Sequence, residues 1–136
     1  MTPPRDCPCR SGARYKACCG PIHGGARAAT PEALMRSRFS AFALGLGDYL
    51  VDTLAREHAD RALPREALAR ELAQIRDRRR FMGLEIRESR ESGDEGWVTF
   101  HARVFEKGKD VSFAERSRFV REDGAWRYAS GEIEEG

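Results

Sequence analysis

Apolar side chains recur at helical spacing in the stretch that follows position 30. A helix is predicted to begin at Pro31, because Thr30 is a good capping residue and Glu32 suits the positive end of a helix dipole. Gly45 and Gly47 predict its end. The apolar stripe of this helix consists of Met35, Phe39, Phe42, Ala43 and Leu46.

Two further helices are predicted before position 81. Asp48 is a candidate cap for a short helix over residues 49–54. Pro64 is expected to open a longer helix, and the arginine-rich run 76–80 is expected to close it, because cations favour the C-terminal end of a helix. The shared apolar face of this longer helix comprises Leu68, Leu72 and Ile75.

Beyond Phe81 the helical period gives way to alternation and turn signals, which are typical of antiparallel strands. The clearest strand is predicted over 97–105, where every second residue from Val98 to Val104 is apolar. Helices followed by a strand meander indicate an α+β fold, in which a curved antiparallel sheet packs on segregated helices. Other strands are expected from residue 84 to a turn at 92–96, over 111–121 and over 125–130, with hairpin turns at 107–110 and 123–124.

The first 29 residues differ in composition from the rest of the chain. They hold all four cysteines and four of the six prolines, but their sizeable apolar residues are only Met1, Tyr15 and Ile22. Burial of so few apolar side chains cannot offset the entropic cost of ordering the backbone, which is about 1–2 kcal/mol per residue. The 136 residues suffice for one domain and a small appendage. We therefore expect an N-terminal module over 1–29 and an α+β domain over 30–136.

Cys7, Cys9, Cys18 and Cys19 form two close pairs on either side of a short loop. Four thiolates match a closed tetrahedral zinc site in number and softness, and iron accepts the same ligands. Metal binding would also supply folding free energy that this segment lacks. The alternatives are disulfides, which a reducing cytosol disfavours, and unrelated buried thiols.

His23 follows the last cysteine by four residues. One interpretation makes it a metal ligand or a hydrogen-bond donor to a ligand. The favoured interpretation is a solvated loop histidine, because Gly24 and Gly25 follow it.

The overall charge balance argues against a general nucleic-acid binder, because 24 basic residues face 22 acidic ones for a net charge of +2. A local basic patch remains, formed by Arg5, Arg10, Arg14 and Lys16. The mean hydropathy is −0.63, and no apolar run approaches the roughly 20 residues that a membrane span requires, so no membrane association is expected. The first residues lack the apolar core of a secretory signal, so a cytoplasmic location is expected.

Residues 7–21 read Cys-Pro-Cys-Arg-Ser-Gly-Ala-Arg-Tyr-Lys-Ala-Cys-Cys-Gly-Pro. This stretch resembles the SEC-C motif, a metal-binding module at the C-terminus of the SecA translocase ATPase. The resemblance implies that Cys7, Cys9, Cys18 and Cys19 are the metal ligands. It extends to the bacterial YchJ family over nearly the whole chain, through residues 22–25, 30–42, 115–119 and 124–128. The YchJ family implies an N-terminal SEC-C module joined to a nuclear-transport-factor-two-like (NTF2-like, cystatin-like) domain, a cone of helices against a strongly curved sheet.

Three positions depart from the SEC-C pattern. Arg10 and Ala13 stand where the motif usually has Gly and Lys, which we expect to alter the loop and to weaken any surface that relies on that Lys. Cys19 stands where the translocase version has His, and four thiolates should still bind zinc tightly.

A second candidate site follows from the superfold, which commonly encloses a pocket between its helices and the concave face of its sheet. Arg38 lies close to the buried helical stripe, where a guanidinium needs a carboxylate or a bound anion, and Glu115 is the expected partner. The alternative is an arginine that snorkels at the helix edge. Polar side chains on strands usually face water, so an enzyme is the less favoured interpretation. The pocket candidates are Arg38, Tyr49, His101, Glu115 and Arg116.

The sequence therefore predicts a small metal-binding protein, with zinc favoured over iron, whose SEC-C module is structural and contacts another macromolecule. The resemblance to the translocase module makes a chaperone or secretion factor the expected class of protein partner. One alternative is an enzyme or small-ligand binder that uses the pocket in the curved sheet. The other is nucleic-acid binding through the basic N-terminal module. No catalytic residue is assigned.

Overall fold

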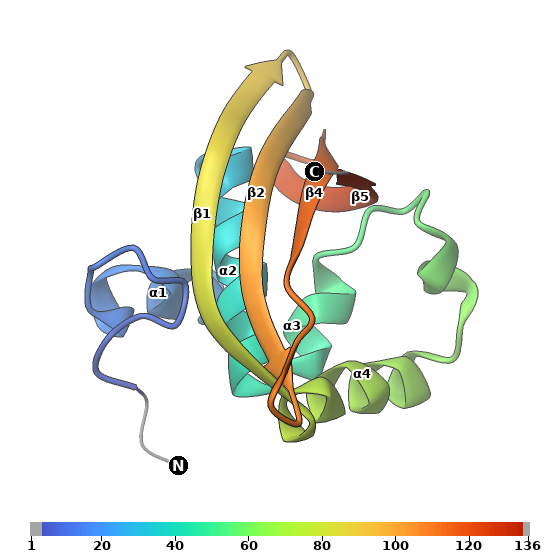
Figure 1. Cartoon of the computed structure of the whole chain (residues 1–136). Helices are drawn as coiled ribbons and strands as arrows, with labels where there is room; N and C mark the ends of the chain where they lie inside the picture. The colour runs from blue at the N-terminus through green and yellow to red at the C-terminus, as the bar shows by residue number, and fades with distance from the viewer. Residues whose placement is uncertain (1–3, 135–136) are drawn as a thin grey trace.

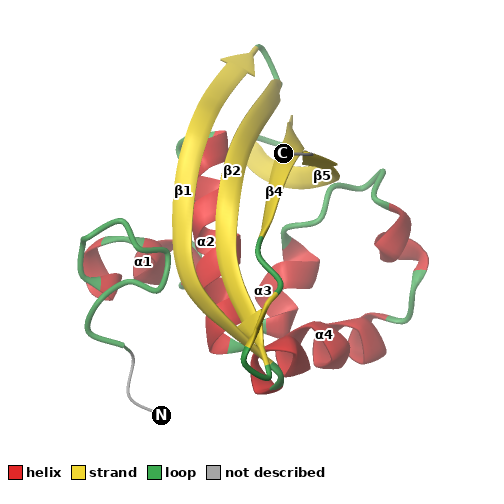
Figure 2. Cartoon of the chain, in the orientation of Figure 1, coloured by secondary structure: helices red, strands yellow, loops and turns green. Residues whose placement is uncertain are grey.

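The computed structural model of the protein describes residues 4–134. Figure 1 shows a long helix, α2, behind a curved sheet, with the N-terminal segment on one side and helices α3 and α4 on the other. Figure 2 shows that the helices and the strands form separate groups. All helices precede the strands along the chain, so the predicted α+β arrangement is confirmed.

Short helices make up most of the helical part. Within the described residues, no helix combines the length and the apolar character needed to cross a bilayer. The helices in chain order are η1 (Tyr15–Ala17), α1 (Cys19–His23), α2 (Pro31–Leu44), α3 (Gly47–Asp52), η2 (Ala59–Ala62), α4 (Arg65–Ala73) and η3 (Gln74–Asp77).

Helix α2 begins and ends where the sequence predicts. The hydroxyl of Thr30 accepts a hydrogen bond from the N–H of Ala33 at 3.0 Å. Gly45 ends the helix in the left-handed conformation, with φ of 74°. The helix is buried well beyond its apolar stripe, because the N-terminal segment and the sheet both pack against it. Its buried polar residues are Ser37, Arg38 and Ser40.

The predicted cap of the next helix is wrong. Leu46, not Asp48, occupies the cap position of α3, and Asp48 lies exposed in the first turn. A Cβ on Gly47 would lie 1.9 Å from the carbonyl oxygen of Ala69 in α4. This close approach between α3 and α4 requires a residue without a side chain at position 47.

The arginine run closes the helical part only at its beginning, because the helical residues end at Asp77 with Arg76 in the last turn. Arg76 lies in η3 and Arg78 follows it, whereas Arg79 and Arg80 begin the first strand. Arg79 is in register with Glu106, and its Nε donates to that carboxylate at 2.9 Å. The cross-strand partner therefore outweighs the helical tendency of the run.

One antiparallel sheet has the strand order β1-β2-β4-β5, with β3 paired to β2. Strand β2 alternates as predicted, with the side chains of its inner face buried from Val98 to Val104. Register shifts after Phe81 and after Ile86 bend β1, and Figure 1 shows β1 and β2 curving together past α2. The strands are β1 (Arg79–Ser92), β2 (Glu95–Glu106), β3 (Lys109–Asp110), β4 (Phe113–Glu122) and β5 (Ala125–Glu134).

The N-terminal segment shares a hydrophobic core with the rest of the chain. Cys7, Cys9, Cys19 and Ala28 belong to the same cluster of buried residues as the inner faces of α2 and β2. The predicted module boundary between residues 29 and 30 falls immediately before α2 and stays a prediction.

Candidate metal centre

The first cysteine pair lies on a tight loop that backbone hydrogen bonds close. The N–H of Cys7 donates to the carbonyl of Ala13 at 3.0 Å, and the N–H of Tyr15 donates to the carbonyl of Arg5 at 3.0 Å. Arg10 adopts the left-handed conformation with φ of 64°, which glycine adopts most readily. The backbone at this position therefore suits the Gly that the SEC-C pattern has there.

The loop brings the two cysteine pairs together. All four Sγ atoms lie within 4.8 Å of one another. The Sγ atoms of Cys9 and Cys18 are 3.6 Å apart, and those of Cys18 and Cys19 are 4.0 Å apart. A disulfide requires about 2.05 Å, and all four residues are free cysteines. The disulfide alternative is therefore wrong for this structure.

The spacing of the sulfur atoms fits a metal ion. Four ligands in a tetrahedron with metal–sulfur bonds of about 2.3 Å lie about 3.8 Å from each other, and the two separations given above fall on either side of that value. Three of the cysteines are buried and Cys18 is partly exposed. The cluster could hold one ion through four sulfur ligands, which would leave no open coordination position for a substrate.

The close packing of the thiols shifts their pKa values in opposite directions. The pKa of Cys9 is lowered by its hydrogen bonds with Cys19 and Cys7, against the opposing effect of burial. The pKa of Cys19 is raised by its hydrogen bonds with Cys7 and Cys9 and by burial. The thiols therefore do not ionise together in the absence of a cation, and a bound divalent ion would allow all four sulfur atoms to carry negative charge.

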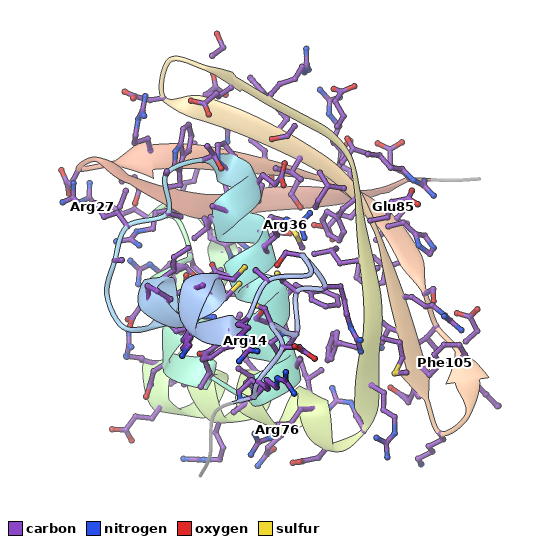
Figure 3. All side chains as sticks on the ribbon, turned by 90° about the vertical axis from the view of Figure 1, so that its left-hand side faces the viewer. Arg14, Arg27, Arg36, Arg76, Glu85 and Phe105 are labelled. Atoms are coloured by element: carbon purple, nitrogen blue, oxygen red, sulfur yellow. The ribbon has the colours of Figure 1, made fainter. Side chains whose placement is uncertain are left out.

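Helix α2 supplies polar groups to the cysteine cluster. Ser40 Oγ donates to Cys19 Sγ at 3.3 Å and lies 3.5 Å from Cys7 Sγ. One turn earlier, Arg36 Nη1 donates to the carbonyl of Cys9 at 3.2 Å and lies 4.0 Å from its sulfur. Figure 3 looks onto this side of the molecule, with Arg36 labelled on α2 beside the N-terminal segment. These donors offset negative charge on the sulfur atoms and hold the cysteines in place.

Arg36 and Ser40 are residues of the site that the sequence alone does not predict. Their spacing of four residues places them on one face of the predicted helix. A polar face on a helix usually meets water, so only the tertiary structure shows that this face meets the cysteines.

His23 joins the N-terminal segment to α2. Its Nε2 donates to the carbonyl of Ser37 at 2.7 Å, so its Nδ1 is the acceptor for the hydroxyl of Tyr15 at 2.6 Å. Burial lowers the pKa of His23 and favours this neutral form. The histidine is half-buried at the end of α1, so the solvated loop histidine that the sequence favoured is wrong, and both ring nitrogens are already engaged by groups other than sulfur.

Two of the five pocket candidates lie together. Arg38 and Glu115 line a cavity of about 280 Å³ between α2 and the inner face of the sheet. Tyr49 lies on α3 outside this cavity. His101 and Arg116 alternate along β2 and β4 with the inward-facing residues, so they project from the other face of the sheet. The structure therefore does not bring these three residues to the cavity.

Arg38 does not form the expected ion pair with Glu115. Its Nη1 donates to the carbonyl of Leu50 at 2.8 Å and to Thr53 Oγ1 at 2.5 Å, and its guanidinium lies 4.8 Å from the ring centroid of Tyr128. The side chain is buried and does not snorkel. Burial lowers the pKa of Arg38 to about 10, so the group stays protonated at neutral pH. No spacing rule predicted these partners, because they come from distant parts of the chain.

Comparisons with known proteins agree with this architecture. The SEC-C motif matches residues 6–21, and the middle NTF2-like domain of YchJ matches residues 30–131. A UPF0225 protein of Streptomyces coelicolor is 43% identical over 136 residues, which is 97% of each chain.

Two solved structures have the same arrangement. The solution structure of a SEC-C motif containing protein from Rhodopseudomonas palustris has a TM-score of 0.81 and 39% identity, covering 95% of this chain and 98% of that chain. The crystal structure of a SEC-C motif containing protein from Psychrobacter arcticus has a TM-score of 0.76 and 25% identity, covering 96% and 83%. The chain therefore belongs to the UPF0225 family and joins a SEC-C motif to a YchJ-type NTF2-like domain.

Proposed function

We propose that the four cysteines bind one zinc ion, and that this ion folds the N-terminal module into an element that docks on a protein partner. The observation that carries the proposal is the gathering of four sulfur atoms within 4.8 Å in a segment with almost no apolar side chains of its own. Zinc prefers closed tetrahedral sites of this composition, and iron is the competing metal.

The energetics of the segment favour a structural role for the ion. Zinc contributes about 10–16 kcal/mol of apparent free energy in zinc-finger peptides at neutral pH. A contribution of that order would offset the ordering of the loop that carries Cys7 and Cys9. Four sulfur ligands also fill the coordination sphere, so the ion would hold the module together rather than activate a substrate.

The outer surface of the module supports a docking role. Arg5, Arg10, Arg14 and Lys16 are exposed, while three of the four cysteines are buried on the side that packs on α2. Asp6 is the only acidic residue among the first 29 positions. A surface of this kind complements an acidic segment of another protein, and electrostatic complementarity increases the rate and the specificity of association.

The metal is tested on protein purified without chelator and without heating. Native mass spectrometry of the wild type should show one zinc per chain, and Cys9→Ser should lose it. Ser130→Ala, on the exposed part of β5, is the matched control and should retain it. Metal-free wild type with the N-terminal segment fully folded would contradict the proposal, and bound iron would replace zinc as the assigned metal.

The docking role is tested by combining Arg10→Glu, Arg14→Glu and Lys16→Glu in one variant. This variant should keep its zinc but lose protein partners that the wild type retains in a pull-down, and Cys9→Ser should lose both. Retention of the same partners by the charge-reversed variant would contradict the docking role and leave the zinc assignment intact. Salt-dependent binding of the wild type to DNA or RNA, without a protein partner, would favour the nucleic-acid alternative.

A further inference from the structure

The cavity between α2 and the sheet has apolar walls and one polar region. Its volume of about 280 Å³ lies just below the range for small-molecule pockets, about 300–1,000 Å³. Most of the lining is aromatic or aliphatic. The polar side chains that line the cavity besides Arg79 are Arg38, Glu115, Ser117 and Tyr128.

The cavity and the cysteine cluster lie on different faces of α2. Met35, Arg38 and Phe39 line the cavity, whereas Arg36 and Ser40 contact the cysteines. The cavity and the cysteine cluster are therefore separate sites.

Arg38 lines the cavity and has hydrogen-bond donors that meet no protein acceptor in the described structure. The side chain is only 7% exposed, and its hydrogen bonds within the described structure all come from Nη1. Every solvent-inaccessible side-chain nitrogen or oxygen among the described residues has a partner. Nε and Nη2 of Arg38 therefore keep some accessible surface, and the cavity is a space that Arg38 lines.

Glu115 supplies the opposite charge and an acceptor. Its Oε2 accepts hydrogen bonds from Ser117 at 2.5 Å and from the hydroxyl of Tyr128 at 3.1 Å. The absence of a side chain at Gly131 leaves room for this group, since a Cβ there would lie 2.3 Å from Glu115 Oε2. Glu115 forms no ion pair with Arg38 in the described structure, yet both side chains line the cavity, so their opposite charges offset each other there.

We propose that this cavity binds a small uncharged molecule with an apolar body and a head that both accepts and donates hydrogen bonds, as a primary amide does. The acceptor of the head meets the free N–H groups of Arg38, and its donor meets Glu115. The body occupies the space among the aromatic side chains. An anion or a cation would upset the charge balance and leave a buried charge without compensation, which is costly.

Benzamide is the probe, titrated into the full-length, metal-loaded protein and followed by ¹H–¹⁵N correlation spectra. We expect saturable shifts at cavity residues such as Phe100 and Ser117. Benzoate, benzylamine and ethylbenzene have similar bodies but a charged head or no polar head, and each should bind about tenfold more weakly or worse. No saturable shift at the cavity, or binding of ethylbenzene or benzoate as tight as that of benzamide, would overturn the proposal.

Two variants test whether benzamide binds in this cavity. Ala102 is 1% exposed and lines the cavity, so Ala102→Leu fills part of the space and should abolish the benzamide shifts. Glu115→Gln keeps the shape but leaves the charge of Arg38 unbalanced, so benzoate should now bind more tightly than benzamide. Arg116→Gln, on the other face of the same strand, is the matched control and should bind as the wild type does.

The results with these variants can overturn the proposed ligand site or the proposed role of charge. Unchanged benzamide binding by a folded Ala102→Leu protein would place the ligand elsewhere and overturn the proposal. If Ala102→Leu fails to fold, the Glu115→Gln comparison decides, because that substitution preserves the hydrogen-bond acceptor for Ser117 and Tyr128. An unchanged preference for benzamide over benzoate in Glu115→Gln would overturn the charge argument.

Discussion

The hydroxyl of Ser40 donates a hydrogen bond to the sulfur of Cys19 across 3.3 Å. Ser40 is fully buried in α2 and also lies 3.5 Å from Cys7 Sγ, so one side chain of the NTF2-like domain touches a cysteine from each pair. The cysteine cluster is thus built partly from the domain on which it rests. Metal binding and packing of the module on α2 should therefore depend on each other.

We expect Ser40→Ala to weaken zinc binding by about 10–100-fold, the usual effect of losing a group that orients metal ligands. The donor to Cys19 is lost, while the volume change in the core is small. Competition with a chromophoric chelator measures the affinity, and Ser130→Ala is the control at an exposed position. An affinity of Ser40→Ala within twofold of the control would show that the hydrogen bond does not support the site.

Chelation of the metal should release the module and leave the sheet intact. The N–H groups of Cys7 and Tyr15 hold the loop through bonds to Ala13 and Arg5, and a segment with so few apolar residues has little else to protect them. Hydrogen exchange of these amides should accelerate by at least about tenfold after chelation, while amides of β2 keep their protection. Equal protection before and after chelation would show that packing alone folds the segment.

The sequence predicted those elements whose cause is local. Helix α2 carries its own cap at Thr30 and its own stop at Gly45, and β2 alternates because one of its faces is buried. Arg79 and Arg80 were assigned to a helix because a run of cations favours a helix end. Their strand conformation depends on pairing with Glu106 and Phe105, more than twenty positions away, which a local pattern does not reveal.

The same distinction holds for the candidate sites. The four cysteines could be recognised because their number, spacing and apolar-poor surroundings indicate one kind of chemistry. Arg38 was recognised as a buried charge, but its partners Thr53 and Tyr128 were not, since the α2–α3 packing and the last strand bring them there. Burial can be predicted from helical spacing, whereas the identity of a distant partner depends on tertiary packing.

We expect Arg10→Gly to stabilise the metal-loaded protein by about 0.5–1 kcal/mol. Arg10 has a left-handed backbone conformation, which costs a non-glycine residue about 1–2 kcal/mol. Relief of this cost is partly offset, by about 0.5–1 kcal/mol, because glycine is more flexible than arginine in the unfolded chain. Denaturant unfolding of the zinc-loaded proteins provides the measurement. Arg14→Gly, at a position with ordinary extended backbone, is the control and should destabilise. Equal loss of stability in both variants would contradict relief of strain at Arg10.

The neutral state of His23 makes the attachment of the module sensitive to acid. Its Nδ1 accepts from Tyr15 and its Nε2 donates to the carbonyl of Ser37, so a proton added at Nδ1 would force the Tyr15 hydroxyl to turn and accept instead of donate. Burial lowers the pKa of His23 below the ordinary value of 6.5. The unfolded chain therefore takes up a proton before the folded protein does as the pH falls.

By linkage, the stability associated with neutral His23 is fully present above pH 6.5 and decreases as the pH falls below that value. His23→Gln lacks this titration, so the difference in free energy of unfolding between wild type and variant should shrink on acidification. Any acid-induced loss of metal affects both proteins, and the comparison at matched metal occupancy removes it. A titration of the His23 ring by NMR should give a midpoint below 6.5, and a midpoint above 6.5 would reverse the sign and contradict the lowering of the pKa by burial.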